Sequence, residues 1–421
     1  MGFRFNSFFH LFLLLFGLIF LMMPIGTLAQ AATLQHVASY PLNEGESAMG
    51  VTIDGTIAYL SCDFSGIKLI NIADPTTPSF LGSCPTPSFA RNLVVRGGYA
   101  YVADGDSGLQ VVNISNPAAP TIVGNYETPG TALSVALSGD YAYLADGYSG
   151  MLVINISNPA NPTLTGTYNG FSYLMGVAIV GNYAFVTANF VEPDYGQLQA
   201  IDISDPANPS FVNGANYGGG AYGVTISGNY AYMAAFSYGL GVFNISNPAV
   251  PTLVGSLDTP GSTKRIYANA GIGLLADGYS GIELLDIATN PANPVPLDSV
   301  DTFGNSSEVV LSGEYVYVAN EYTLEIYRMI SSGGCHYIPG DVNGPNSFTG
   351  LDITYMVRFF KGGPHPPYSC ECPAGSGNTW YVSGDINGSC SFTGLDITYG
   401  VRYFKGGPSP IPCPSCPPNG R

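Results

Sequence analysis

The stretch GDYAYLADGYSGMLVINISNPANPTLTGTY, residues 139–168, decides the fold, because the chain repeats it with small changes. Related copies are GGYAYVADGDSGLQVVNISNPAAPTIVGNY from residue 97 and GNYAYMAAFSYGLGVFNISNPAVPTLVGSL from residue 228. The first proline of each Asn-Pro or Asp-Pro pair recurs at spacings of 42, 42, 47, 42 and 43 residues, at Pro75, Pro117, Pro159, Pro206, Pro248 and Pro291. A period near 42 residues built of β-patterned runs predicts a propeller with one four-stranded blade per repeat.

Each repeat divides into four strand-like runs. In the third copy, apolar alternation and the β-branched and aromatic content predict strands at 132–138, 141–145, 150–156 and 162–168. Ser-Gly-Asp, Asp-Gly and Asn-Pro supply the turns between them. No run with helical periodicity competes in this region.

The two ends of the repeat region complement each other. The last copy, residues 306–329, has three strands but lacks a fourth, PTLVG-like strand. The segment LQHVASYP, residues 34–41, resembles a fourth strand with no preceding three. Closure by this strand would leave no unpaired edge. We therefore expect an all-β, seven-bladed β-propeller over residues 32–330, followed by a small α-helical C-terminal domain.

Three copies of one strand carry a family resemblance. The segments LQVVNIS (109–115), MLVINIS (151–157) and LQAIDIS (198–204) resemble the signature of the LVIVD-repeat family. Its members are predicted cell-surface propellers of bacteria and archaea, so the resemblance implies a fold and a surface location. It implies no particular reaction.

The N-terminus has the organisation of a secretory signal. Arg4 precedes the apolar run 11–25, and small residues end in Ala29-Gln30-Ala31. We expect residues 1–31 to be removed by cleavage near Ala29 or Ala31, with an uncleaved anchor as the alternative. The sequence shows no second run of membrane length. The expected location is extracellular or at the cell surface, with no transmembrane segment after cleavage.

Charge and cysteine content narrow the classes of partner. The formal net charge of −17 repels nucleic acid and anionic membrane and suits neutral ligands or divalent cations. In an exported chain the eight cysteines favour disulfides over metal ligation or thiol catalysis. Cys62 and Cys84 lie on strands separated by one strand, roughly 9 to 10 Å apart, so a bridge between them stays open. The other six, whose pairing is also open, are Cys335, Cys370, Cys372, Cys390, Cys413 and Cys416.

One face of the propeller offers a candidate ligand site. The loops between strands two and three share a face with the connections between blades, and they carry aromatic residues and aspartates. The candidates are Phe64, Asp104, Asp146, Tyr148, Glu192, Asp194, Tyr195, Tyr238, Asp277 and Tyr279. Such a ring could stack a sugar or hold a peptide. Turn chemistry is the alternative for the aspartates, whereas the long loop of blade four, residues 190–197, is not repeated and is the better functional candidate.

Little in the propeller region points to catalysis. His36 is its only histidine, so the sequence offers few residues for a Ser-His-Asp triad or for a metal site with histidine ligands. Paired carboxylates for glycoside cleavage stay open, with Glu192, Asp194 and Asp202 as the acids to inspect and ordinary surface acids as the alternative. We lean towards a protein that is not an enzyme; an enzymatic version would be a glycoside hydrolase or polysaccharide lyase.

The C-terminal region repeats a second motif. GDVNGPNSFTGLDITYMVRFFKGGP (340–364) returns as GDINGSCSFTGLDITYGVRYFKGGP (384–408). Calcium loops take oxygen ligands from positions one, three, five, seven, nine and twelve. These positions hold Asp341, Asn343, Ser347, Thr349 and Asp352 in the first copy, and Asp385, Asn387, Ser389, Ser391, Thr393 and Asp396 in the second. Pro345 offers no side-chain oxygen, so we expect the first loop to bind Ca²⁺ more weakly. Each loop precedes an amphipathic run, and Lys-Gly-Gly-Pro then ends the expected helix.

These paired loops and helices resemble a dockerin type I module over residues 340–408. The resemblance implies that the eleven residues hold Ca²⁺ and that the module docks onto a cohesin-like scaffold protein. The cohesin-facing positions carry over to Gly350, Leu351, Gly394 and Leu395, where dockerins commonly have small hydroxyl residues. Residues 331–339 would be a linker and 409–421 a Cys/Pro-rich tail. A calcium-stabilised end-cap without a partner is the alternative.

Together these features predict an exported, non-catalytic binding or adhesion propeller, anchored to a scaffold or surface through a calcium-dependent dockerin-like module. The propeller face would take a carbohydrate or peptide ligand. The first alternative is a dockerin-borne carbohydrate-active enzyme in polysaccharide breakdown, and the second is a purely structural surface protein.

Overall fold

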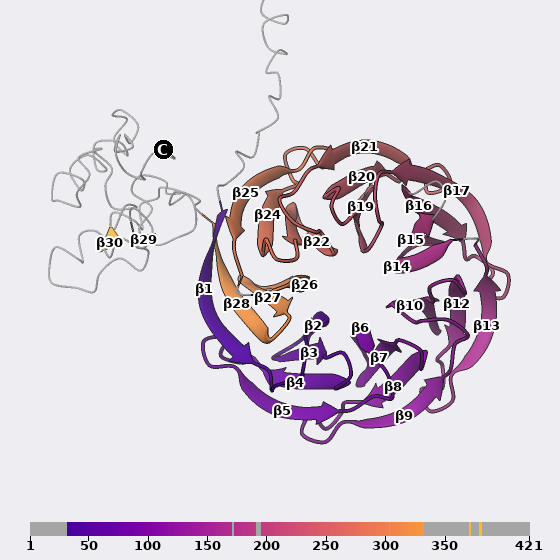
Figure 1. Ribbon diagram of the computed structural model, residues 1–421, viewed down its shortest axis with the longest axis horizontal. Helices are drawn as coiled ribbons and strands as arrows, with labels where there is room; N and C mark the ends of the chain where they lie inside the picture. Colours follow the sequence, from indigo (N-terminus) through magenta and orange to yellow (C-terminus); the bar gives the residue numbers. More distant parts are fainter. Residues whose placement is uncertain are drawn as a thin grey trace, which may run out of the picture.

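The structure is a computed structural model that describes residues 32–170, 172–190, 195–302 and 304–331, with 370–371 and 379–380. The expected signal, calcium loops and tail helices lie outside these residues. Residues 32–331 form seven four-stranded antiparallel sheets arranged in a ring, seen along its axis in Figure 1. The all-β, seven-bladed propeller is confirmed.

The blades follow the chain order, and the first strand of each is the innermost in the ring (Figure 1). Blades one to three comprise β2 (Gly50–Asp54), β3 (Ile57–Ser61), β4 (Ile67–Asn71) and β5 (Ser79–Cys84); β6 (Ala90–Arg96), β7 (Tyr99–Asp104), β8 (Leu109–Asn113) and β9 (Thr121–Tyr126); and β10 (Ser134–Ser138), β11 (Tyr141–Ala145), β12 (Met151–Asn155) and β13 (Thr163–Tyr168). The four strands expected in the third repeat are therefore found within two residues of their expected limits.

Blades four to six comprise β14 (Tyr173–Val180), β15 (Tyr183–Phe190), β16 (Tyr195–Asp202) and β17 (Ser210–Tyr217); β18 (Val224–Ser227), β19 (Tyr230–Ala234), β20 (Leu240–Asn244) and β21 (Thr252–Leu257); and β22 (Arg265–Asn269), β23 (Ile272–Ala276), β24 (Ile282–Asp286) and β25 (Val295–Val300). Blade seven has β26 (Ser306–Ser312), β27 (Tyr315–Asn320) and β28 (Thr323–Ser331). A separate short pair consists of β29 (Cys370–Glu371) and β30 (Thr379–Trp380).

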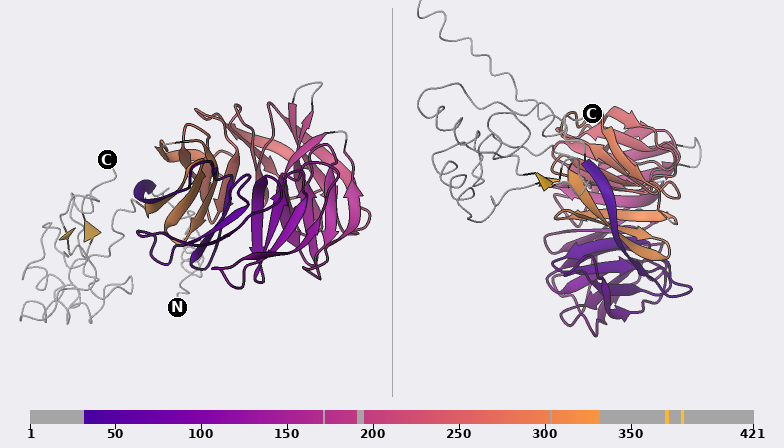
Figure 2. Two further views of the ribbon diagram at one scale, coloured as in Figure 1. Left: turned by 60° about the horizontal axis from the view of Figure 1, so that its bottom comes forward. Right: turned by 90° about the vertical axis from the view of Figure 1, so that its left-hand side faces the viewer.

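The N-terminal strand β1 (Ala32–Pro41) completes blade seven, as the sequence predicts. It pairs antiparallel with β28, from Ala32 opposite Ser331 to Pro41 opposite Thr323. Figure 2 shows β1 running along the outer edge of the ring beside β28. The first and last segments of the propeller are thus joined within one sheet, and the ring has no open junction.

Blades are buried on both faces, which explains the nearly continuous apolar runs in the repeats. In blade three, Leu144 and Ile154 pack towards blade two, whereas Tyr143 and Val153 pack towards blade four. Successive side chains of a strand point to opposite faces, so a strand between two neighbouring blades needs apolar residues at every position.

The glycine of the PTLVG-like strands β5, β9, β13 and β21 has a packing role. A Cβ atom built on Gly124 would lie only 2.2 Å from the carbonyl oxygen of Pro159. Gly124 lies at an irregularity where the pairing of β8 with β9 shifts register. The Asn-Pro turn of the next blade occupies the space that a side chain would need. The close packing of this turn on the strand therefore explains both the repeated glycine and the repeated proline.

Cys62 and Cys84 are buried and unpaired, with β4 lying between their strands. The blade-one disulfide left open by the sequence is therefore absent. Burial raises the pKa of the Cys62 thiol to about 12, which makes this thiol unreactive at neutral pH. Among residues 32–331 that the structure describes, none forms a helix long and apolar enough to cross a membrane.

Candidate ligand-binding site

The turns between strands two and three lie on the same face as the connections between blades. Isolated bridges join Gly105 to Ala132, Gly147 to Leu174 and Gly278 to Ser306. In each, the turn of one blade contacts the start of the first strand of the next blade. These turns and connections together form the face that we call the loop face.

The aspartates that recur in these turns are buried and accept hydrogen bonds from the backbone and from threonines. Asp277 accepts hydrogen bonds from Thr259 Oγ1 at 2.8 Å, Thr263 Oγ1 at 2.7 Å and the Gly261 N–H at 2.8 Å. Asp104 and Asp146 accept equivalent bonds from Thr86 and Thr128 and from the Ser88 and Gly130 N–H groups. Each clamp fixes the connection that leads into its own blade.

These aspartates offer no free oxygen to a ligand, because Asp104 and Asp146 are 0% exposed and Asp277 is 1% exposed. Burial raises the pKa of Asp104 and Asp146, against hydrogen bonds that lower it. Their hydrogen bonds give these aspartates a structural role in the turns, as the turn-chemistry alternative describes. The expectation that they face a ligand does not fit this geometry.

The aromatic candidates are exposed on the loop face. The exposed fractions are 68% for Phe64, 72% for Tyr148, 53% for Tyr238 and 72% for Tyr279. Sequence reasoning missed Tyr322, 59% exposed, which occupies the corresponding turn of blade seven. An alignment of Asn320-Glu321-Tyr322 with Asp277-Gly278-Tyr279 would have found it.

One part of the loop face is hollowed among aromatic rings. An open groove of about 500 Å³ lies between blades three, four and five. We call it the aromatic groove; its lining residues are Tyr148, Tyr173, Met175, Asn189, Phe190, Gly220 and Tyr222. None of these described residues carries a charge at neutral pH.

Ring packing fixes the walls of the aromatic groove. Tyr148 meets Tyr173 edge to face, with 4.7 Å between ring centroids. Phe190 stacks on Tyr195 at 4.8 Å, which brings the expected residue Tyr195 to the back of the groove wall. Tyr222 stacks on Phe236 at 5.2 Å. Such packing holds the rings in place before any ligand arrives.

Asn189 fixes the floor of the groove. Its side chain donates to the Ala221 carbonyl at 2.8 Å and accepts from the Ala221 N–H at 2.6 Å. These two hydrogen bonds couple blade four to the segment that leads into blade five. Of the expected residues, Tyr148 lines the groove and Tyr195 stacks on its lining residue Phe190. Phe64, Tyr238 and Tyr279 do not line it, and Glu192 and Asp194 lie outside the described residues.

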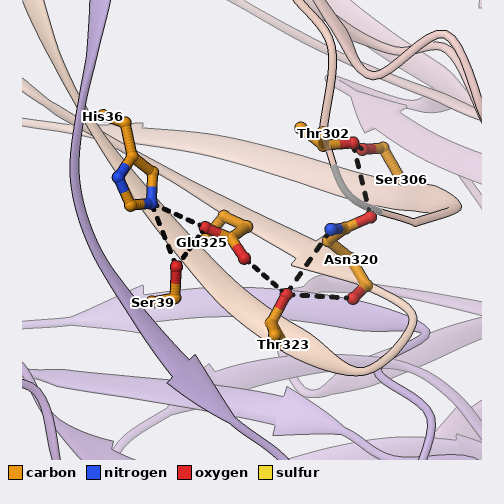
Figure 3. Close-up of polar contacts among 7 residues, drawn as sticks. All are labelled: His36, Ser39, Thr302, Ser306, Asn320, Thr323 and Glu325. Carbon is orange, nitrogen blue, oxygen red and sulfur yellow. Dashed lines mark hydrogen bonds and ion pairs between the residues drawn. The ribbon is translucent and has the colours of Figure 1, made fainter.

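The one histidine of the propeller does not form a catalytic relay. His36 Nε2 lies 2.8 Å from Glu325 Oε2 and 3.0 Å from Ser39 Oγ (Figure 3). A Ser-His-acid relay uses both ring nitrogens, one for the acid and one for the nucleophile. Here a single nitrogen meets both groups, and the cluster instead joins β1 to β28.

The other chemical candidates also lie away from the groove. Asp202 is at the far end of β16, where its Oδ1 accepts the Ser204 N–H at 2.8 Å. That end of the strand is opposite to the loop face, so Asp202 cannot pair with an acid near the groove. Within the described ranges, no group of three His, Cys, Asp or Glu residues could hold a metal ion.

Comparison with known proteins assigns the repeats. The LVIVD repeat model matches residues 89–128, 129–170, 173–216, 218–259 and 303–326. The protein is thus a seven-bladed β-propeller containing LVIVD repeats, and that part of the resemblance is confirmed. A search of curated proteins finds no match.

Solved propellers share the fold at low sequence identity. The computationally designed Ika8 protein is 11% identical with a TM-score of 0.52, covering 70% of this chain and 99% of that chain. U3-55K is 10% identical with a TM-score of 0.54, covering 70% and 98%. The RRP9 WD40 repeats are 9% identical with a TM-score of 0.53, covering 70% and 97%. At these identities the likeness concerns the fold alone.

Proposed function

We propose that this propeller is a non-catalytic binding module that holds its ligand in the aromatic groove of the loop face. The observation that carries this proposal is the convergence of Tyr148, Tyr173, Phe190 and Tyr222 around one open, uncharged groove. Aromatic faces bind flat apolar surfaces of ligands, and prepacked rings lose little entropy on binding.

The lining of the groove favours binding over hydrolysis. Glycoside cleavage needs two carboxyl groups on opposite sides of the scissile bond, about 5 to 10 Å apart. No acid lines the aromatic groove among the residues that the structure describes. A dockerin-borne hydrolase would therefore need its acids outside this groove.

Export and attachment complete the proposal. The apolar run and the small residues before residue 31 support secretion. The doubled loops supply an all-oxygen donor set, which fits the hard cation Ca²⁺. In this proposal Asp341, Asn343, Ser347, Thr349 and Asp352 would hold one ion, and Asp385, Asn387, Ser389, Ser391, Thr393 and Asp396 a second.

The tail would then dock onto a cohesin-like scaffold or another surface partner. Its contact positions carry Gly350, Leu351, Gly394 and Leu395 rather than hydroxyl residues. Apolar contacts bury well against apolar surface. The partner that fits these four positions presents an apolar patch.

Retention and product assays together test the proposed function. The full protein is incubated, with Ca²⁺ present, with immobilised polysaccharides and peptides, and both bound protein and released reducing ends are measured. Retention without reducing ends is expected. Released sugar would establish a hydrolase and overturn the proposal, and failure to bind any matrix would remove the case for a binding module.

A further inference from the structure

The aromatic groove lies where the innermost strands of blades four and five begin, beside the central channel that the blades of a propeller surround. Met175 and Tyr222 line the groove. They are followed by Gly176, in the innermost strand of blade four, and by Gly223, directly before the innermost strand of blade five. A Cβ atom built on Gly176 would lie 3.3 Å from the Cα atom of Gly223. The two glycines therefore lie side by side, each next to a residue that lines the groove.

Arg265 occupies the space that Gly223 leaves free. Its Nη1 atom lies 3.2 Å from a Cβ atom built on Gly223, so the side chain of blade six extends over blade five. On the other side, Glu308 of blade seven extends over Gly50 of blade one, with its Oε2 atom 2.9 Å from a Cβ atom built there. Glycines at these positions make room for two charged side chains in the channel mouth.

Asn92 connects these elements across the ring. Its Nδ2 atom donates to Glu308 Oε2 at 3.2 Å, and its Oδ1 atom accepts the Val135 N–H at 3.2 Å. The side chain of blade two thus contacts both blade seven and blade three. Asn92, Arg265 and Glu308 are all half-buried and within reach of solvent.

The guanidinium group of Arg265 is available to a ligand. The four ion pairs in the described part of the chain involve other residues. No described residue accepts a hydrogen bond from Arg265, whereas its neighbour Lys264 donates to Asn305 Oδ1 at 2.5 Å. A half-buried guanidinium offers planar donors that suit paired acceptor atoms.

The charges around the mouth balance. Burial raises the pKa of the Glu308 carboxyl, and the nearby positive charge of Arg265 opposes this rise. Arg91 Nη1 lies 3.9 Å from Asp63 Oδ1. Lys264 interacts with the negative charge of Glu321. The described residues that line the groove are uncharged, and those at the mouth carry both signs of charge, so neither a strongly anionic nor a strongly cationic ligand is favoured.

Rings for stacking, together with planar polar groups and no net charge, fit one ligand chemistry. A sugar ring has an apolar C–H face for aromatic stacking and neighbouring hydroxyls for Arg, Asn and Glu side chains. We infer that the groove and the channel mouth form one site for the end of a neutral oligosaccharide. The terminal sugar lies among Asn92, Arg265 and Glu308, and the following sugars stack on Tyr222, Tyr173 and Tyr148. This inference rests on the proposed function of the groove.

Calorimetry with defined oligosaccharides tests the inference. The full protein is titrated with linear cello-, xylo-, manno- and malto-oligosaccharides of two to six units, and with oligogalacturonides as acidic counterparts. At least one neutral series is expected to bind, more tightly than the acidic series, with affinity that rises with length until the groove is filled. No binding of any neutral series, or tighter binding of the acidic series, would overturn the inference.

Variants separate the channel mouth from the groove. Arg265→Gln and Asn92→Ala are each expected to weaken binding at least about tenfold. Arg96→Gln is the matched control, because Arg96 ends the innermost strand of blade two away from the mouth, and it should leave affinity unchanged. Thermal melting of every variant shows whether it is folded.

The outcomes also separate this inference from the proposed function. If Tyr222→Ala removes binding while Arg265→Gln and Asn92→Ala do not weaken it, the groove is the binding site but the channel mouth is not. If the groove variant also retains full affinity, the groove proposal fails together with the inference.

Discussion

Ser39 Oγ donates a 2.6 Å hydrogen bond to Glu325 Oε2, although the two residues are 286 positions apart in the sequence (Figure 3). Glu325 is 5% exposed and also accepts a 2.7 Å bond from Thr323 Oγ1. The pair fastens the N-terminal strand to the rest of blade seven. Closing the ring therefore depends on a buried carboxylate whose partners come from both β1 and β28.

Replacing Ser39 by Ala should destabilise the propeller by about 1 to 3 kcal/mol, because the buried carboxylate loses a donor. Denaturant unfolding measures this difference. Ser237→Ala, in an exposed turn of the loop face, is the control and should stay within about 0.5 kcal/mol of the parent. Equal stability of the two variants would show that the Ser39–Glu325 bond does not hold the ring closed.

The aspartate clamp of blade six gives a second stability test. Asp277→Ala leaves Thr259, Thr263 and the Gly261 N–H without their shared acceptor and should cost about 3 kcal/mol. Asp277→Asn should cost less, because blade seven uses Asn320 at the corresponding place, with Oδ1 3.4 Å from Thr302 Oγ1. If the alanine and asparagine variants unfold at the same denaturant concentration as the parent, the hydrogen bonds to Asp277 do not stabilise the propeller.

Much of the architecture could be predicted from the repeats, because packing between blades imposes the same residues in each copy. The strand positions and the closure by β1 are examples. The clamps were missed, although a signal exists: Thr86, Thr128, Thr259 and Thr302 each stand 18 positions before the residue they contact.

The aromatic groove could not be predicted in the same way. Tyr173, Phe190 and Tyr222 occupy different positions in their repeats, so they do not stand out as one recurring residue. They meet only because neighbouring blades place the end of one strand beside the start of another. A site that departs from the repeat becomes visible only when the blades are placed in space.

Glu283 predicts a pH dependence of stability. Burial, and then the charge of Asp277, raise the pKa of Glu283 to about 7, and its Oε2 atom has no hydrogen-bond partner among the described residues. The folded state therefore holds this proton more tightly than the unfolded state, whose pKa is about 4.3. The contribution of Glu283 to the free energy of unfolding is greatest at pH values below its unfolded-state pKa, and it falls as pH rises towards about 7.

The substitution Glu283→Gln should remove this loss of stability at higher pH. We expect the variant to match the parent at pH 4.5 and to exceed it at pH 8 by on the order of 1 kcal/mol, since solvent screens part of the effect. Thermal melting at both pH values measures the difference. Glu314→Gln, at an exposed ion pair with Arg328, is the control. A Glu283→Gln variant no more stable than the parent at pH 8 would contradict the assignment.

Calcium titration of the full chain tests the C-terminal part of the proposal. Calorimetry should detect one or two ions per chain, with weaker binding at the first loop because Pro345 supplies no side-chain oxygen. Asp385→Ala and Asp396→Ala should each remove the tighter site, since a carboxylate ligand is lost. Absence of any calcium response would leave the cysteines as the only stabilising feature proposed for this region, and the dockerin-like assignment should then be dropped.

The most direct test of the binding site compares two tyrosines that are equally exposed. Tyr148 and Tyr279 are each 72% exposed at corresponding turns, but only Tyr148 lines the aromatic groove. Affinity for the matrix that retains the parent protein is measured for Tyr148→Ala and Tyr279→Ala. A loss of at least about tenfold in Tyr148→Ala, with Tyr279→Ala unchanged, is the predicted result. Equal affinities of the two variants would contradict a ligand site in the groove.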